Sequence, residues 1–391
     1  MSSLQAFMIF SLPVTGMCYA VLGALKLPLC DRLKLDEAKA GGLVSSFGLM
    51  VGPIILLSGF LADAVGRKGV WVAGAVLVAA SLILMSRARK YSTAVVAVLM
   101  LSGGWAAMIN VANALMFQAY TNVFMATNLL NFFFGLGAFL TPPVLAWLIV
   151  RVKFPKALTA FGLLAAATAV FALWVNMQAA SAAAPAGFGA LICDPVMWLC
   201  AVTLMFWTPL EASTAAWTTS FVTALSPQGE AVEKSQRIAG WTLSGFWLCF
   251  MGSRLIAAVL AGSTDASVAQ AVHTAYLSHI VLAVLCIATV LGLVFSRKRA
   301  LTVGLLLFAG LLYGPFFPNL MAVLLNHFPV ELHGRAVGVL FGCASIGWTV
   351  IPAIIGKVAA RTTLQRGFLI AAGDALLLLG IVVAHFIYAG H

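Results

Sequence analysis

The amino-acid sequence predicts an all-α membrane protein with twelve transmembrane helices in two six-helix pseudo-symmetric halves. Three observations predict this class: an apolar composition, twelve spans of membrane length, and an uncharged linker after the sixth span. Of the 391 residues, 63% are hydrophobic and only 8% are charged. Ordinary soluble domains are about 45–50% apolar and about 25% charged. The composition therefore excludes a water-soluble core.

Each predicted span is a mostly apolar run of about 20 residues or more, the length that crosses the hydrocarbon of a bilayer. In chain order they cover residues 5–29, 40–61, 70–88, 93–118, 122–150, 157–178, 195–225, 238–262, 272–295, 300–326, 334–359 and 367–389. The first run lacks a basic start and continues directly into a second span, so we expect a span there rather than a removable signal peptide. The connections are too short for a soluble domain.

The chain divides at a segment of Ala, Ser, Gly and Pro that carries no charge, a composition typical of linkers. We expect an N-terminal half over residues 1–178, a linker over 179–192 and a C-terminal half over 193–391. A short repeat supports the division, because the Gly137 to Pro142 spacing in the fifth span recurs from Gly347 to Pro352 in the eleventh. Two halves of like design are typical of transporters.

A charged turn from Gly59 to Gly69, Gly-Phe-Leu-Ala-Asp-Ala-Val-Gly-Arg-Lys-Gly, separates the second and third spans. The pattern Gly-x-Leu-Ala-Asp-x-x-Gly-Arg-Lys resembles the loop between the second and third helices of major facilitator superfamily transporters. The resemblance implies the major facilitator fold and a cytoplasmic position for this loop. The matching residues, which we name the gate motif, are Gly59, Asp63, Gly66, Arg67 and Lys68.

In the gate motif, Gly66 is expected to allow a turn where a side chain would collide. The carboxylate of Asp63 can accept hydrogen bonds from free N–H groups at the start of another helix. The eleventh span begins nearby in the expected fold, at residues 334–336. The resemblance implies that Asp63 and Arg67 latch the two halves on the cytoplasmic side, and a solvated turn is the alternative.

The seventh span contains Glu211, in the run Phe-Trp-Thr-Pro-Leu-Glu-Ala-Ser-Thr-Ala-Ala-Trp. An acid in the middle of a span is costly and marks a substrate or proton path. We expect Pro209 to break the helix just before it. The run resembles the seventh helix of the fucose–proton symporter branch, in which an aromatic-rich run precedes a Glu and a Trp follows. A packing hydrogen bond is the alternative role of Glu211.

The same branch resemblance extends to Trp247 and Arg254 in the eighth span and to Gly314-Pro-Phe-Phe-Pro318 in the tenth. The sequence departs from that branch in the fourth span, where Ile109 stands at the position of the branch's Glu, and no acid lies in the first span. Coupling would therefore use Glu211, with Asp374 or His279, or the protein would be a facilitator without coupling.

Further polar and aromatic residues in the spans are candidates for binding a substrate. Asn110 and Asn113 share one helix face because they are three residues apart. Hydrogen bonding between helices is the alternative for both. Arg254 could bind an anionic substrate or form a structural ion pair. The remaining candidates are Asn131, Trp217, Tyr313 and Asn319.

The basic residues favour the opposite orientation to the gate motif. The odd-numbered connections, together with the span ends beside them, hold 18 of the 22 Lys and Arg, and the positive-inside rule would place them in the cytoplasm. We follow the motif and predict a multi-pass protein of the bacterial inner membrane with cytoplasmic termini.

The sequence contains no phosphate-binding Gly-rich loop, no nucleophile elbow and no cluster of metal ligands. The 7 cysteines form no C-x-x-C pair. We therefore predict no enzymatic activity, no cofactor, no metal and no nucleic-acid partner. We predict a monomeric transporter in the lipid bilayer that moves a small-molecule substrate, preferably a sugar or polyol, by alternating access, with or without protons. The alternatives are an organic-anion transporter and a non-transporting membrane scaffold or sensor.

Overall fold

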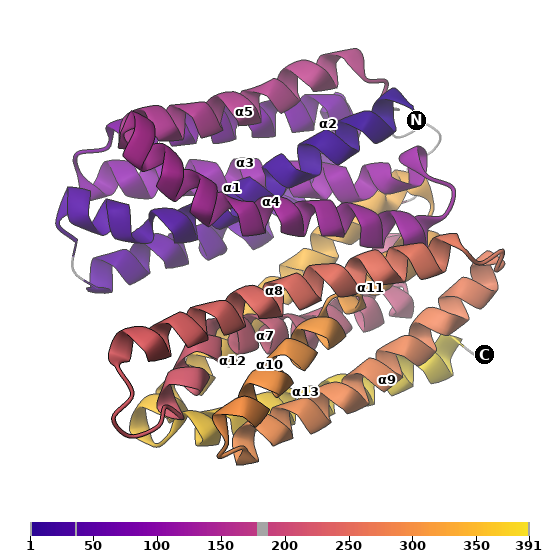
Figure 1. The fold of residues 1–391 in the computed structure, drawn as a ribbon. Coiled ribbons are helices and arrows are strands. Elements are labelled where there is room, and N and C mark those ends of the chain that lie inside the picture. The colour runs from indigo at the N-terminus through magenta and orange to yellow at the C-terminus, as the bar shows by residue number, and fades with distance from the viewer. Residues whose placement is uncertain (1, 36, 178–186, 390–391) are drawn as a thin grey trace. The chain divides into compact units, whose positions relative to one another are not determined.

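The computed structural model describes residues 2–35, 37–177 and 187–389 (Figure 1). The described residues form helices and no strand. The first five long helices are α1 (Ser3–Leu33), α2 (Glu37–Arg87), α3 (Tyr91–Ala119), α4 (Val123–Val152) and α5 (Phe154–Trp174). The C-terminal part contains α6 (Phe188–Cys193), α7 (Pro195–Ala224), α8 (Val232–Gly262), α9 (Val268–Phe295), α10 (Arg299–Tyr313), α11 (Phe316–His327), η1 (Val330–Leu332), α12 (His333–Arg361) and α13 (Leu364–Ala389).

Eleven described segments are long and apolar enough to cross a membrane, and Ser46–Ala62 is a shorter apolar helix. Their positions match the twelve predicted spans in order. The prediction of an all-α, twelve-span membrane protein is confirmed. The chain is therefore a multi-pass integral membrane protein.

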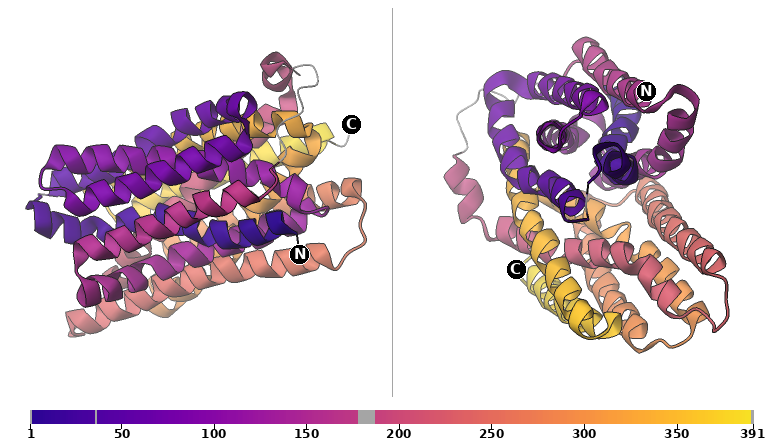
Figure 2. Two further views of the ribbon diagram at one scale, coloured as in Figure 1. Left: turned by 90° about the horizontal axis from the view of Figure 1, so that it is seen from above. Right: turned by 90° about the vertical axis from the view of Figure 1, so that its left-hand side faces the viewer.

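Two compact units make up the chain. The N-terminal unit comprises Met1–Ala126, Leu130–Leu191 and Phe328–Gly342, and the C-terminal unit comprises Thr127–Leu129, Ile192–His327 and Cys343–His391. In the N-terminal unit α2 packs against α3 and α5, and in the C-terminal unit α13 packs against α9 and α7. The right panel of Figure 2 views the helices of the N-terminal unit nearly end-on. The predicted linker stays a prediction, because residues 178–186 lie outside the described residues.

The expected loop at residues 59–69 is helical almost throughout, which corrects the sequence-based expectation. The backbone of α2 leaves helical geometry only at Gly66, where φ is 81° and ψ is 152°. That region of conformational space is accessible essentially to glycine alone. The expected steric reason was wrong, because a Cβ atom built on Gly66 meets nothing within 4 Å. The positive φ, rather than crowding, requires glycine here.

The repeated glycines occupy equivalent places in the two units. A Cβ atom on Gly137 of α4 would lie 1.8 Å from the carbonyl oxygen of Pro13 on α1. A Cβ atom on Gly347 of α12 would lie 1.8 Å from the carbonyl oxygen of Met205 on α7. Each glycine therefore allows the backbones of two helices to touch, as small residues do between membrane helices. The repeat in the sequence corresponds to a repeat in the packing.

Candidate functional site

Glu211 lies in the middle of α7, on a helix that is continuous from Pro195 to Ala224. The expected break before Glu211 was therefore wrong, and Pro209 lies inside the helix. Proline removes only one N–H group from the ladder, and the carbonyl four residues earlier belongs to Met205, at the close approach to Gly347. The packed backbone of α12 thus supports the helix where the proline weakens it.

Arg254 of α8 is the charged neighbour of Glu211. It is only 5% exposed, and its guanidinium interacts electrostatically with the Glu211 carboxylate. Its Nε atom donates a hydrogen bond of 2.9 Å to the carbonyl of Gly314, and the guanidinium carbon lies 4.1 Å from the centroid of the Phe250 ring. Arg254 thus connects α7, α8 and the end of α10.

The carbonyl that Arg254 binds is available because the tenth span is broken. Helix α10 ends at Tyr313 and α11 begins at Phe316, with Gly314 and Pro315 between them. Pro318, four residues after Gly314, has no N–H group, so the Gly314 carbonyl needs another donor. A guanidinium, with five donors in a rigid plane, suits this task. The sequence analysis assigned no break to this span, although Gly-Pro pairs interrupt helices.

Tyr313 is fully buried directly before the break. Its hydroxyl lies 3.2 Å from the Thr214 hydroxyl on α7, one helical turn after Glu211. Trp207, one turn before Glu211, stacks on Phe316 with ring centroids 5.7 Å apart. The residues around Glu211 on α7 therefore contact both sides of the break.

Two other candidates of the C-terminal unit have structural contacts. Trp217 is half-buried and packs edge-on against Phe368 with ring centroids 5.9 Å apart. The side chain of Asn319 on α11 accepts a hydrogen bond of 2.8 Å from Asn128, a residue of α4 that the unit includes. Sequence reasoning did not select Asn128 for the site, although an Asn in a span is a recognisable signal.

The proposed coupling alternatives lie elsewhere in the C-terminal unit. His279 on α9 is buried, with Nε2 3.2 Å from the Phe316 carbonyl. Asp374 on α13 is 3% exposed, and its carboxylate oxygens have no hydrogen-bond partner among the described residues. It lies at an open, mostly apolar hollow of about 570 Å³. The lining residues are Ile351, Leu369, Ile370, Gly373, Asp374, Leu376 and Leu377.

The three asparagine candidates of the N-terminal unit are buried. Asn110 donates from Nδ2 to the carbonyls of Ile55 at 3.1 Å and Gly334 at 3.0 Å. Asn113 donates to the Ile109 carbonyl of its own helix at 2.8 Å. Asn131 lies on α4 and is 7% exposed. Asn110 thus joins α2 to the start of α12, as the structural alternative expected.

The gate motif packs against the start of α12. A Cβ atom on Gly59 would lie 2.5 Å from the carbonyl oxygen of Gly334, so the two backbones touch. Nη2 of Arg67 donates to the Val330 carbonyl at 2.7 Å, and the side chain is only 3% exposed. Lys68 donates instead to the Leu173 carbonyl at 3.2 Å. The side chain of Asp63 lies outside the described residues.

No group of three or more His, Cys, Asp or Glu that could hold a metal ion occurs among the described residues. The polar groups around Glu211 are a carboxylate, a guanidinium, hydroxyls and backbone carbonyls. This set suits the binding of a polar organic molecule or a proton.

Comparisons with known proteins agree with this architecture. The family model of the Major Facilitator Superfamily matches residues 7–352. A search of curated protein sequences finds no match.

Solved transporter structures share the fold at low sequence identity. The E. coli fucose:proton symporter aligns with a TM-score of 0.77 and 14% identity, covering 97% of both chains. The human organic anion transporter MFSD10 gives a TM-score of 0.73 and 16% identity, covering 97% of this chain and 99% of that one. A proton:xylose symporter gives 0.76 and 12% identity, with 96% and 94% covered. At these identities the likeness concerns the fold alone.

Proposed function

Because this chain belongs to the major facilitator superfamily, we propose that it is a secondary transporter moving a sugar or sugar-like polyol by alternating access. The similar folds include two proteins described as sugar:proton symporters. The chain contributes its own support through the chemistry of α7. Family membership indicates a transporter rather than an enzyme.

The observation that carries the proposal is the environment of Glu211. The carboxylate lies in a span, half-buried, with Arg254 as its charged neighbour. Among the described residues no hydrogen bond to Glu211 is formed, so its oxygens are available to a hydroxyl or a proton. An acid placed in a span at such cost marks a substrate or proton path. Glu211 would accept a sugar hydroxyl, exchange the coupling proton, or do both in turn.

The remaining candidates take supporting positions in this proposal. Trp217 and Tyr313 would border the substrate, since aromatic faces pack against the apolar faces of sugars. Asn319 would supply an amide group for a substrate hydroxyl within the C-terminal unit, and Asn113 and Asn131 are the amide candidates of the N-terminal unit. Asn110 would act at the gate instead, because both of its bonds join helix backbones.

The gate motif would close the cytoplasmic side, with Asp63 and Arg67 as the latch. This proposal includes a bacterial inner membrane location, cytoplasmic termini and a monomer. It also includes two functional halves, over residues 1–178 and 193–391, joined by the linker at 179–192.

A second candidate function is transport of an organic anion, which Arg254 favours. Its guanidinium is buried near the Glu211 carboxylate, and a buried guanidinium is a group that can bind a carboxylate of a substrate. The basic connections would raise the local concentration of anions. One similar fold is described as an organic anion transporter.

A thermal-shift screen of sugars and carboxylates on the purified protein tests both candidates. A true ligand stabilises the folded state by mass action and so raises the melting temperature. At a ligand concentration of 100 times its Kd, the unfolding free energy rises by about 2.7 kcal/mol. Hits would then be tested for flux in liposomes at low and high ionic strength. Uptake of a neutral sugar should be insensitive to salt, whereas uptake of an anion should weaken. Binding without flux would support the scaffold or sensor alternative.

A further inference from the structure

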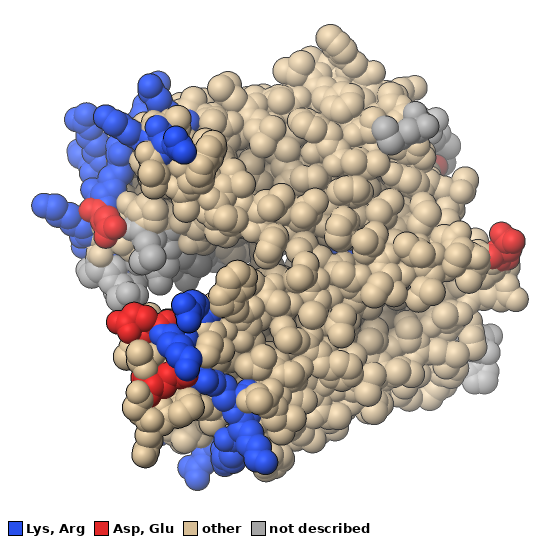
Figure 3. All heavy atoms as spheres, in the orientation of Figure 1, with Lys and Arg blue, Asp and Glu red and all other residues tan. Residues whose placement is uncertain are grey.

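One end of the N-terminal unit carries a dense group of exposed cations. Figure 3 shows Lys and Arg gathered at one end of each unit, with the visible sides almost free of charge. In the N-terminal unit we name this group the basic patch. It consists of Arg32, Arg87, Arg89, Lys90, Lys153 and Lys156, all of them exposed.

Arg32 brings the parts of the basic patch together. Its Nε atom donates to the carbonyl of Ala88 at 3.3 Å, in the connection between α2 and α3. Its guanidinium lies 5.1 Å from the centroid of the Phe154 ring, at the start of α5. The connections that carry Arg87, Arg89 and Lys90 on one side and Lys153 and Lys156 on the other are therefore neighbours.

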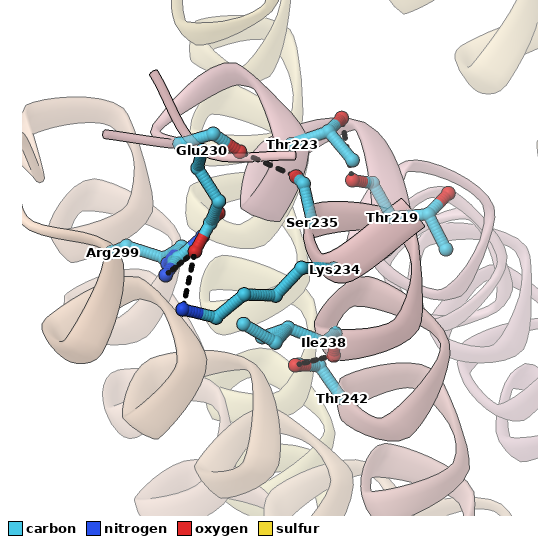
Figure 4. Close-up of polar contacts among 9 residues, drawn as sticks. Thr219, Thr223, Glu230, Lys234, Ser235, Ile238, Thr242 and Arg299 are labelled. Carbon is cyan, nitrogen blue, oxygen red and sulfur yellow. Dashed lines mark hydrogen bonds and ion pairs between the residues drawn. The ribbon is translucent and has the colours of Figure 1, made fainter. Parts of the chain in front are cut away.

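Within the described residues, no carboxylate pairs with the cations of the basic patch. None of the six forms an ion pair with a carboxylate of the described residues. The acid beside Arg32, Asp31, is exposed and likewise forms no ion pair within the described chain. The C-terminal unit differs, because Glu230 there binds both Arg299 and Lys234 (Figure 4). The N-terminal unit thus presents uncompensated positive charge.

Two helices begin inside the basic patch with a lysine at the N-cap, where an acidic or hydroxyl side chain is usual. The N-cap residues of α3 and α5 are Lys90 and Lys153, neither with a side-chain cap, and neither helix has an acid in its first turn. Helix N-termini carry positive partial charge and favour anions, so lysines there add like charge. An external anion would relieve this repulsion.

The position of the basic patch at the ends of the spans favours a lipid headgroup as the source of the anion. The cations lie at the ends of apolar spans, since Arg87 and Val152 end spans and Tyr91 and Phe154 begin them. Nearby, Trp147 is 59% exposed with Arg151 over its ring at 5.9 Å. Exposed Trp beside Arg is typical of the headgroup level of a bilayer. A phosphate at that level belongs to a lipid.

We propose that the basic patch is a binding site for the headgroup of an anionic phospholipid. The phosphate would contact the lysines at the starts of α3 and α5, and the acyl chains would lie along the apolar sides of the same helices. Zwitterionic lipids carry a cation of their own and fit this patch less well.

The test uses the full-length protein in detergent, titrated with dioleoyl-phosphatidylglycerol or dioleoyl-phosphatidylcholine, with the melting temperature as readout. We expect the anionic lipid to stabilise the wild type strongly and the zwitterionic lipid weakly. A triple variant, Lys90→Gln, Lys153→Gln and Lys156→Gln, should bind the anionic lipid about 100-fold more weakly, about fivefold for each cation. The matched variant with three Lys→Arg changes should keep the affinity. Circular dichroism would verify that both variants fold.

Three results would each overturn the proposal. The first is equal stabilisation by the two lipids. The second is an unchanged affinity of the Lys→Gln variant for phosphatidylglycerol. The third is the same stabilisation by inorganic phosphate, which would make the patch a site for free anions. Lipid binding that weakens as sodium chloride is raised supports the proposal, because salt screens exposed charges.

Discussion

Glu211 is the residue on which the proposed transport chemistry depends. Arg254 is its charged neighbour among the described residues, and one turn further along α7 the Thr214 hydroxyl meets that of Tyr313 on α10. A carboxylate within a span has few ways to be stabilised other than a cation, a proton or a substrate. Protonation of the Glu211 carboxylate and binding of a substrate to it would therefore affect each other.

Replacing Glu211 with Gln keeps the shape and removes the charge. We expect uphill accumulation of the substrate to be lost while downhill exchange survives, because a proton carrier is needed only for accumulation. Both are measured as uptake into liposomes with and without a pH gradient. Asp265→Asn, an exposed acid of the same unit, is the control and should keep accumulation.

If downhill exchange and affinity fall together in Glu211→Gln, the residue accepts a substrate hydroxyl instead. Unchanged accumulation would contradict both roles and leave Glu211 a packing residue.

Arg254 holds the break in the tenth span. Arg254→Lys keeps the charge but cannot reproduce a planar group that both stacks on Phe250 and donates to Gly314. We expect a loss of about 1.5–3 kcal/mol in unfolding free energy, the usual contribution of a hydrogen bond to a charged group. The measurement is thermal unfolding in detergent, with Lys357→Arg, an exposed exchange of the same type, as the control. An unchanged melting temperature would show that the contact does not stabilise the break.

Helix α2 and the start of α12 are in contact through their backbones as well as through side chains. Gly59 and Gly334 allow the approach, and Asn110 and Arg67 donate to carbonyls at the start of α12 and just before it. The resemblance of the gate motif to a family latch emphasised charged residues. The described residues add the Gly59–Gly334 approach and the hydrogen bond from the Asn110 amide to that contact.

Gly59→Ala should loosen this contact, because its Cβ atom would lie 2.5 Å from the Gly334 carbonyl oxygen. Overpacking of this kind costs about 1–3 kcal/mol. We expect a cysteine at the buried position Ala336 to react with a water-soluble maleimide about tenfold faster or more, in a background without reactive native thiols. Gly48→Ala on the same helix, where a Cβ atom meets nothing within 4 Å, should have no effect. Equal labelling rates in both variants would refute the gate role of Gly59.

The connection between α7 and α8 is tied to the start of α10 by Glu230 (Figure 4). The hydrogen bond from Arg299 holds the pKa of Glu230 below its ordinary value, and Lys234 adds to this effect. Because the pKa is lowered, the pair stabilises the folded state at pH values above the ordinary pKa of about 4.3. This stabilisation is lost as the pH falls through the pKa of the folded state.

We therefore expect the melting temperature of the wild type to fall between about pH 5 and pH 3 more steeply than that of Glu230→Gln. Thermal unfolding at several pH values measures this difference. Glu233→Gln, an acid of the same segment that forms no ion pair with the described residues, should follow the wild type. Parallel curves for the wild type and Glu230→Gln would show that the pair is not coupled to folding.

At the scale of the whole molecule, two features of the sequence favour opposite orientations of the protein in the membrane. The gate motif favours cytoplasmic termini, and the basic connections favour the reverse. A cysteine at Ala64 should react only with reagent added from the inside, and one at Arg89 only from the outside. The reverse pattern would show that the basic residues determine orientation and that the motif does not.

The twelve spans, the division into two halves and the position of an acid, Glu211, within the seventh span could be predicted from composition, periodicity and short motifs. These features are local, because a span needs only enough apolar residues to cross the bilayer. The spacing of Gly137 and Pro142 also predicted an equivalent feature in the eleventh span, and its packing agrees. The break at Gly314 was accessible to the same reasoning, since Gly-Pro is a local signal.

The partners of the buried polar side chains and the continuity of α7 could not be predicted, because they depend on which helices pack against each other. Asn110, Arg67 and Arg254 donate hydrogen bonds to backbone carbonyls 55 or more residues away in the chain, and a carbonyl carries no sequence signal. Pro209 was expected to break α7, yet the helix continues where it packs against α12. The sequence by itself determined the membrane class, the number of spans and the acid in the seventh span, because these follow from the cost of placing polar groups in hydrocarbon. Only the tertiary structure decided which polar groups are bound and which are left available, because that depends on contacts between distant segments.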